Sequence, residues 1–204
     1  MTLMLKPELS PVNAPMLTLV AALAVSAAIV KTTGRPAGIK WPNDIVMNGK
    51  KVCGILTEMS AQMDYVNHIV IGIGINVHNE SFPEEIAPVA TSLYMETGEH
   101  FNRAALIEEV WEQFEHYYAI FMETEDLSGL VKEYDAHHAA GRADRGYLGE
   151  QKTCICRRSL CARCLRICVR DTVQTVSVET VWKGMSEWKK WYCAVRAHTI
   201  KNFI

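Results

Sequence analysis

The sequence predicts an α+β domain over residues 1–138, because helical and hairpin patterns occur together in that segment. Residues 14–33 carry small or apolar side chains on every side of a helix, which predicts a buried helix. Residues 45–47 and 51–59 are apolar runs joined by Asn-Gly. This dipeptide supplies the two positive φ angles of a type I′ turn at low cost, so we expect a β-hairpin here.

The ends of the expected helices have recognisable signals. Asn13 is placed to cap the buried helix and Gly34 to end it, since glycine adopts the left-handed conformation readily. Residues 1–6 alternate like the end of a strand. Asn102 should cap a second helix, and residues 127–137 should form a shorter third one. The apolar residues that repeat at helical spacing in the second helix are Leu106, Val110, Phe114, Tyr117 and Phe121.

Residues 66–77 form a β-rich run that contains Gly72 and Gly74. Glycines weaken a strand, and their usual reason is the close approach of a ligand or of another backbone. The pattern Gly-x-Gly-x-Asn lacks the third glycine of a dinucleotide-binding fingerprint, and no long helix pattern follows directly. We therefore expect a strand against which a flat ligand lies.

The composition changes after residue 140. Residues 1–140 carry 8 Lys and Arg against 18 Asp and Glu, a net charge of −10, whereas residues 141–204 carry 13 against 5, a net charge of +8. Six of the seven cysteines and three of the five tryptophans also lie in this second part. We expect residues 139–204 to form a separate, irregular Cys/Arg-rich tail.

Several explanations of this tail remain open. A shifted reading frame would explain the simultaneous rise in Cys, Arg and Trp, and we favour it. Cys161 and Cys164 have the spacing of zinc ligands, but no second matched pair accompanies them. A nucleic-acid patch is the third explanation, and its arginines would be Arg157, Arg158, Arg163, Arg166 and Arg170.

The segment Lys40-Trp41-Pro42-Asn43-Asp44 is the first that indicates chemistry. Proline fixes its own φ and restricts the residue before it, so the lysine precedes a stiff backbone. Asn43 and Asp44 are expected to form hydrogen bonds within the turn. Taken alone, the segment favours a hairpin entry that carries a solvated lysine over a functional site.

Three segments in this order resemble the core of the biotin protein ligase family. They are Lys-Trp-Pro-Asn-Asp at 40–44, Gly-Ile-Leu-x-Glu at 54–58 and Gly-x-Gly-Ile-Asn-Val at 72–77. Ala-Thr-Ser-Leu at 90–93 matches a further family segment, and the resemblance covers residues 1–138. The family fold implies a mixed β-sheet flanked by helices, shared with class II aminoacyl-tRNA synthetases.

The resemblance implies roles for individual residues. Lys40 corresponds to a lysine that reaches the biotin carboxylate and the α-phosphate of ATP, so it is the expected catalytic residue. The positions implied around biotin or the adenylate are Lys40, Gly54, Leu56, Gly72, Gly74 and Asn76. Asp44 is expected to organise its turn rather than act as a base. Lys51 is expected in solvent at the hairpin turn, so that Lys51→Ala changes activity little. No metal ligand is expected among these residues.

The family reaction implies the substrates and partner. Biotin and ATP, with Mg²⁺, would give biotinyl-AMP, and a lysine of a biotin carboxyl carrier domain, as in acetyl-CoA carboxylase, would then take the biotin. One alternative is an inactive fragment that at most binds biotin or a partner, and another is a lipoate ligase-like enzyme. The upstream Gly/Arg-rich loop, the biotin-ring segment, the helix-turn-helix domain and the closing β-barrel of family members are not recognisable here. We therefore expect an incomplete catalytic domain without a DNA-binding part.

The apolar helix also resembles the core of a signal peptide, but residues 16–30 are too few to span a membrane. A buried helix and a cytoplasmic protein without membrane contact are the preferred interpretation. Cys53 should be a small core residue. His137 and His138 should lie at a solvated helix end rather than form a metal pair.

Overall fold

The computed structural model describes residues 1–137, 145–147, 153–161, 164–169 and 172–177. In the first of these ranges the sheet strands are β1 (Thr2–Leu5), β2 (Gly38–Lys40), β3 (Asp44–Met47), β4 (Lys50–Ala61) and β5 (Val66–Ile75). The helices are η1 (Ala14–Met16), α1 (Leu17–Thr33), α2 (Leu93–Thr97), α3 (Arg103–Thr124), η2 (Ser128–Leu130) and α4 (Val131–His137). The α+β class predicted from the sequence is confirmed.

The five strands form one sheet in the order β1-β5-β4-β3-β2, and every neighbouring pair is antiparallel. A parallel bridge between Lys51 and Ala90 adds the mixed character that the family fold implies. The hairpin between β3 and β4 is confirmed, because Asn48 and Gly49 have φ angles of 49° and 78°. Such a pair of positive φ angles belongs to a type I′ turn.

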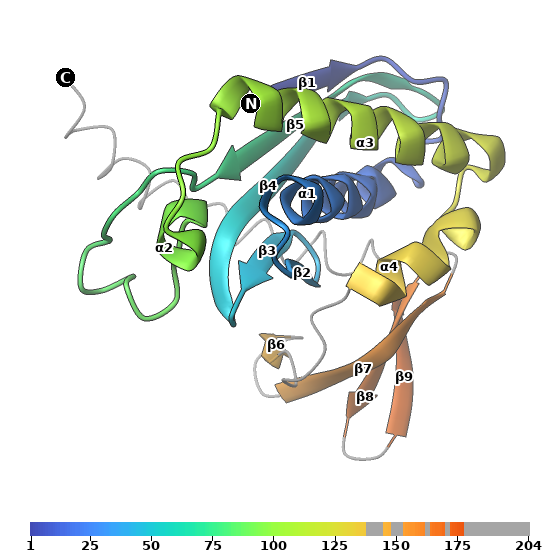
Figure 1. The fold of residues 1–204 in the computed structure, drawn as a ribbon. Coiled ribbons are helices and arrows are strands. Elements are labelled where there is room, and N and C mark those ends of the chain that lie inside the picture. Colours follow the sequence, from blue (N-terminus) through green and yellow to red (C-terminus); the bar gives the residue numbers. More distant parts are fainter. Residues whose placement is uncertain (138–144, 148–152, 162–163, 170–171, 178–204) are drawn as a thin grey trace.

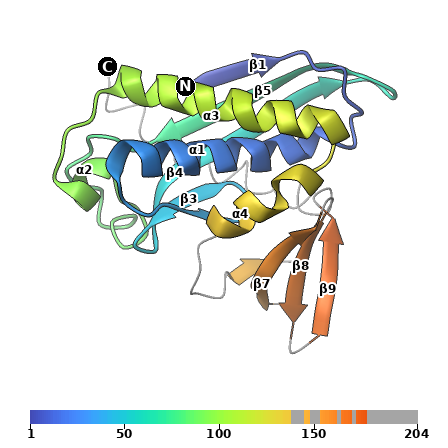
Figure 2. The same cartoon turned by 45° about the vertical axis from the view of Figure 1, so that its right-hand side comes forward.

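Helices α1 and α3 pack side by side over one face of this sheet (Figures 1 and 2). α1 is buried along nearly its whole length, and the Thr18 hydroxyl donates to the Thr57 hydroxyl of β4 at 2.9 Å. By length and composition the segment Ala14–Thr33 could cross a membrane, but 83% of its apolar window is buried in the fold. The structure therefore uses it as the core helix that the sequence predicted.

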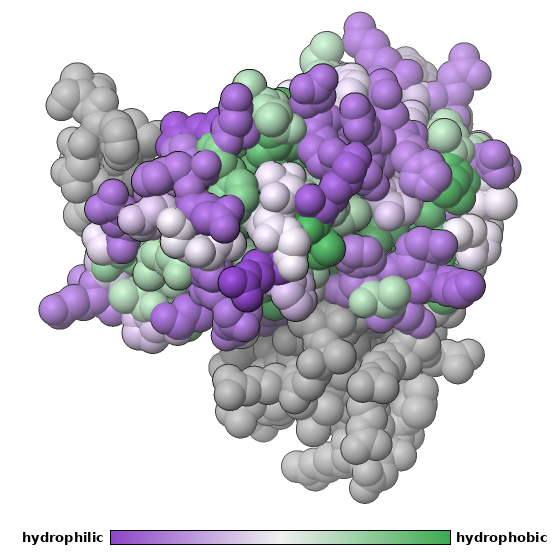
Figure 3. Space-filling view, in the orientation of Figure 1, coloured by the Kyte–Doolittle hydropathy of each residue, from purple (hydrophilic) through white to green (hydrophobic). Residues whose placement is uncertain are grey.

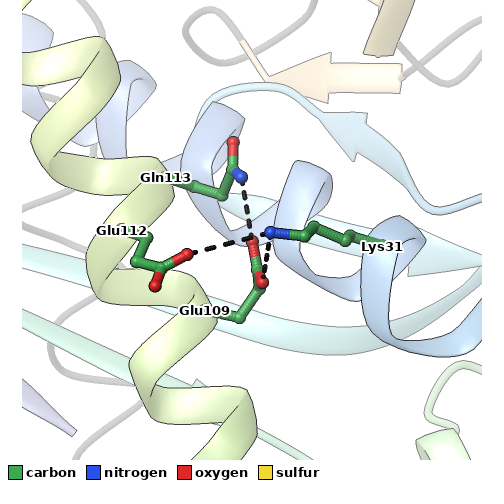
Figure 4. A network of polar contacts seen from close by, with 4 residues as sticks. All are labelled: Lys31, Glu109, Glu112 and Gln113. Atoms are coloured by element: carbon green, nitrogen blue, oxygen red, sulfur yellow. Dashed lines mark hydrogen bonds and ion pairs between the residues drawn. The ribbon is translucent and has the colours of Figure 1, made fainter.

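A partly exposed ion-pair network joins α1 to α3 (Figure 4). Lys31 Nζ lies 2.7 Å from Glu109 Oε2 and 3.8 Å from Glu112 Oε2, and Gln113 Nε2 donates to Glu109 Oε1 at 2.9 Å. The hydrogen bond between Lys31 and Glu109 raises the pKa of the lysine and lowers the pKa of the glutamate. The side of the domain drawn in Figure 3 is mostly hydrophilic, with small separate hydrophobic areas.

The predicted helix ends are partly right. Gly34 ends α1 with a φ of 64°, and the Asn102 side chain accepts hydrogen bonds from Ala104 N and Ala105 N at the start of α3. The predicted cap at Asn13 is wrong, because its side chain makes no cap bond. Its φ of −89° and ψ of −18° are helical, whereas a capping residue needs an extended backbone.

The tail is more regular than predicted in its described parts. β6 (Arg145–Tyr147), β7 (Thr153–Cys161), β8 (Cys164–Val169) and β9 (Thr172–Ser177) form a four-stranded antiparallel sheet in chain order. The expectation of an irregular tail is therefore wrong for these residues. A register shift between Cys156 and Leu160 breaks the period of two within β7, which hides the strand pattern in the sequence. The division into two domains at residue 138 stays a prediction.

Candidate functional site

The predicted site residues gather on the face of the sheet that is turned away from α1. Residues opposite each other on neighbouring strands point to the same side. One row crosses four strands through Lys40, Asp44, Gly54 and Gly74, and the adjacent row pairs Leu56 with Gly72. We call these six residues, together with Lys51, the glycine face; they are half-buried or exposed, whereas the alternating residues between them face α1 and are buried.

Gly72 and Gly74 are not required by packing against the described residues. A Cβ added to Gly72 would meet only the Leu56 carbonyl oxygen, at 3.7 Å, and one added to Gly74 only the Gly54 carbonyl oxygen, at 3.9 Å. Both are ordinary van der Waals distances, and neither glycine has a positive φ. Packing against the described residues therefore does not explain why these two positions carry glycine, and the flat ligand expected from the sequence stays a prediction.

Lys51 belongs to the glycine face, contrary to the expectation that it is a solvated turn residue. A register shift in the hairpin pairs it with Val46, which points to the same side as Asp44. Its Nζ lies 2.5 Å from Asp44 Oδ1, and the two side chains are 32% and 16% exposed. The structure thus supplies two cations here, Lys40 from β2 and Lys51 from β4, and the second is held in place by a carboxylate.

Asn43 and Asp44 bind the neighbouring strand instead of forming the predicted bonds within their own turn. Asn43 Nδ2 donates to the Ile55 carbonyl at 2.8 Å, and Ile55 N donates to the Asn43 carbonyl at 2.9 Å. Because Lys40 precedes this anchored segment by three residues, the contact fixes the β2–β3 connection against β4. No turn signal in the sequence points to this partner.

Asn76 lies directly after β5 and connects three segments. Its N–H donates to the Val52 carbonyl at 2.8 Å, its carbonyl accepts from Leu93 N at 3.0 Å, and its Nδ2 donates to the Thr91 carbonyl at 3.0 Å. The residue therefore lies at the end of the glycine face. Its side-chain amide holds Thr91, whose N–H donates to the Lys51 carbonyl.

The remaining singled-out residues lie away from the glycine face. Cys53 is 1% exposed, and burial raises the pKa of its thiol to about 12, which confirms a core residue. His137 is not solvated as predicted, because its Nδ1 lies 2.9 Å from the buried Ser26 hydroxyl. Burial lowers the pKa of His137. His138 and the side chains of the tail cysteines are outside the described residues.

Comparisons with known proteins agree with this arrangement. Residues 1–76 match the model of the Biotin/lipoate A/B protein ligase family. A stretch of 124 residues, 60% of this chain, is 47% identical to the Bifunctional ligase/repressor BirA of Bacillus spizizenii and covers 38% of that protein. Another of 102 residues, 48% of this chain, is 40% identical to the Biotin--[acetyl-CoA-carboxylase] ligase of Paracoccus denitrificans and covers 42% of it.

Solved structures show the same fold. The biotin protein ligase from Aquifex aeolicus in complex with biotin and ATP superposes with a TM-score of 0.68 and 26% identity, over 86% of this chain and 73% of that one. The fold of this chain is therefore similar to that of biotin protein ligases, and its first 76 residues carry the match to the family model. It spans about two fifths of the length of the Bacillus and Paracoccus relatives.

Proposed function

We propose that this chain takes part in the ATP-dependent ligation of biotin to a lysine of a biotin carboxyl carrier protein, through biotinyl-AMP. The observation that carries the proposal is the glycine face, where bare backbone at Gly54, Gly72 and Gly74 shares one side of the sheet with Lys40 of β2 and Lys51 of β4. A related protein is named as a biotin–[acetyl-CoA-carboxylase] ligase, which supports the same carrier.

The arrangement suits a flat ligand that ends in a carboxylate. The biotin rings would lie on the backbone of β4 and β5 beside the Leu56 side chain, where a Cβ on Gly72 or Gly74 would occupy the space of the ligand. The valerate chain of biotin would then run toward the row that contains Lys40 and Gly74. Its carboxylate would meet the cationic end of the glycine face, which compensates the charge that is removed from water.

The first step brings two anions together. An oxygen of the biotin carboxylate attacks the α-phosphorus of ATP, a new C–O–P linkage forms, and the bond to the β-phosphate oxygen breaks to release pyrophosphate. A fixed cation stabilises the charge that develops on the phosphoryl oxygens. Lys51 is the better preorganised of the two lysines, because Asp44 holds its ammonium at 2.5 Å, whereas Lys40 is exposed.

The second step transfers the biotin. The neutral amine of the carrier lysine attacks the carbonyl carbon of the mixed anhydride, the amide bond forms, AMP leaves, and the amine proton passes to solvent. This step needs the anhydride carbonyl to be accessible from outside, and the exposed position of Gly74 at the rim of the glycine face is consistent with that requirement.

Residues 1–137 contain no cluster of side chains suited to bind magnesium. This part of the chain has no group of three or more His, Cys, Asp or Glu side chains able to hold a metal ion. We assign no magnesium ligand here, and neither step above depends on one. We also propose a cytoplasmic location, because the apolar helix is a core element of the domain.

Calorimetric titration of the full chain with biotin tests the proposed ligand. We expect saturable binding of biotin, with lipoate giving no comparable heat at the same concentrations. Preferential binding of lipoate would favour the lipoate ligase-like alternative. Binding of neither molecule would overturn the assignment of the glycine face as a biotin site.

A further inference from the structure

Lys51 is held through its backbone as well as through its side chain. Its N–H donates to the Val89 carbonyl at 2.7 Å, and its carbonyl accepts from Thr91 N at 2.9 Å. These two bonds make the parallel bridge between Lys51 and Ala90. Because these bonds hold the Lys51 backbone, the placement of residues 89–91 beside β4 fixes the backbone position from which the Lys51 side chain extends.

Thr91 connects this segment to its surroundings with every polar group it has. Besides the bond from its N–H to Lys51, its carbonyl accepts from Asn76 Nδ2 at 3.0 Å. Its hydroxyl donates to Glu96 Oε1 at 2.6 Å. Thr91 is 1% exposed, and buried polar groups are costly to leave without partners, so these bonds support one another.

The Glu96 carboxylate also reaches the turn of the β3–β4 hairpin. Its Oε2 accepts from Asn48 Nδ2 at 2.5 Å, and Asn48 is the first of the two positive-φ residues of that turn. The strands on either side of the turn carry Asp44 and Lys51. A single carboxylate thus joins the hairpin that presents the ion pair to the segment that binds the Lys51 backbone, through bonds strengthened by its charge.

The short helix that carries Glu96 is itself fixed. Ser92 is its N-cap, and the Ser92 hydroxyl accepts from Met95 N at 3.1 Å while donating to the Asn79 carbonyl at 2.5 Å. Glu96 therefore reaches Asn48 and Thr91 from an anchored position. The two hydrogen bonds of its carboxylate go to residues outside the glycine face.

We propose that Glu96 is a positioning residue for the Lys51 cation, acting through Thr91 and Asn48. The proposal rests on the proposed function for the ligand that Lys51 meets, and adds a residue outside the three sequence segments that resemble the family. Loss of the carboxylate contact would loosen residues 89–91 and the hairpin turn together, so that Lys51 would be less well placed for an anionic ligand.

The test exchanges the donor and acceptor of the contact. Asn48→Asp places a second carboxylate against Glu96, and like charges in contact repel. Adding Glu96→Gln to this variant restores one donor and one acceptor, because the new amide donates to the new carboxylate and still accepts from Thr91. Asn67→Asp is the matched control, since it adds the same charge at another exposed asparagine whose amide donates to a side chain, Ser60 Oγ at 3.1 Å.

Amide hydrogen exchange at Lys51 and Thr91 measures how firmly residues 89–91 hold the Lys51 backbone. Biotin titration of the same full-chain samples measures the effect on ligand binding. In Asn48→Asp we expect both amides to exchange on the order of tenfold faster and biotin to bind on the order of tenfold more weakly, because local opening becomes easier. The double variant should return both values close to wild type, and Asn67→Asp should leave them there.

Three outcomes would overturn the proposal: unchanged exchange in Asn48→Asp, a double variant that stays as fast as the single one, or faster exchange with unchanged biotin affinity. Absence of biotin binding by the wild-type chain would instead contradict the proposed function. In that case the exchange rates would still decide whether Glu96 holds the Lys51 segment.

Discussion

Replacing Gly72 by alanine should separate ligand binding from stability. The added Cβ would lie 3.7 Å from the Leu56 carbonyl oxygen, an ordinary contact, and the backbone φ is not positive. Glycine to alanine at such a position stabilises a fold by about 0.4–1 kcal/mol, because the unfolded chain loses freedom. The methyl group would nevertheless occupy the surface on which we place the biotin ring, so biotin affinity should fall about tenfold or more, equivalent to about 1.4 kcal/mol.

Gly129→Ala is the control with the opposite pattern. There an added Cβ would lie 2.7 Å from Ile120 Cγ2, so η2 or α3 must shift, and overpacking of this kind costs about 1–3 kcal/mol. Gly129 is remote from the glycine face, so its variant should bind biotin with wild-type affinity while folded. Urea unfolding gives the free energy of unfolding of both variants, and calorimetric titration gives the affinity of both for biotin. A Gly72→Ala variant that binds biotin normally would refute the placement of the ligand.

Three further predictions concern charges. Lys51→Ala should lower the rate of biotinyl-AMP formation roughly a hundred- to thousandfold, because that is the usual cost of removing one preorganised donor. Lys40→Ala should lower the rate less, and equal rates for wild type and Lys51→Ala would contradict the role of Lys51. Because burial lowers the pKa of His137 from 6.5, the folded state binds fewer protons than the unfolded one below that pH, and stability should fall as the pH drops through 6.5. In His137→Asn, which keeps a polar group near Ser26, unfolding followed by circular dichroism should lose this pH dependence; an unchanged profile would assign it to another group. Lys31→Ala should lower the free energy of unfolding only slightly, because ion pairs of an exposed lysine contribute little, and the loss should be smaller in high salt. A large loss of stability in chemical denaturation would contradict this.

Much of the domain could be predicted from local patterns. The Asn-Gly turn, the buried helix ended by Gly34 and the helix capped by Asn102 each depend on neighbouring residues, and the structure confirms all three. Asn13 failed because residues 10–16 form hydrogen-bonded turns that put its backbone in a helical conformation. A cap signal in the sequence does not reveal a competing turn.

The site was harder to predict because the register between neighbouring strands determines which side chains lie on its face. The three glycines and Leu56 could be assigned by resemblance, but the position of Lys51 on the same face depends on a register shift within the hairpin. Its ion pair with Asp44 and the bonds from Glu96 to Asn48 and Thr91 join residues that are 5 to 48 positions apart. No periodicity in the sequence encodes contacts of that kind.

The tail shows the same limit in another form. Its composition predicted an irregular segment, whereas the described residues of β6 to β9 pair in regular antiparallel register apart from the shift in β7. Limited proteolysis of the full chain distinguishes the two descriptions. A paired tail should be cut slowly between residues 153 and 177, and rapid cutting there with protection of residues 1–137 would favour the irregular one.

We propose that the glycine face activates biotin with ATP. Biotin-dependent exchange of labelled pyrophosphate into ATP by the full chain measures this step alone, because it needs neither the carrier protein nor the transfer step. We expect label to enter ATP only when biotin is present, and Lys51→Ala to reduce the rate roughly a hundredfold or more. Absence of exchange in the wild-type chain, or exchange that continues unchanged in Lys51→Ala, would contradict the claim.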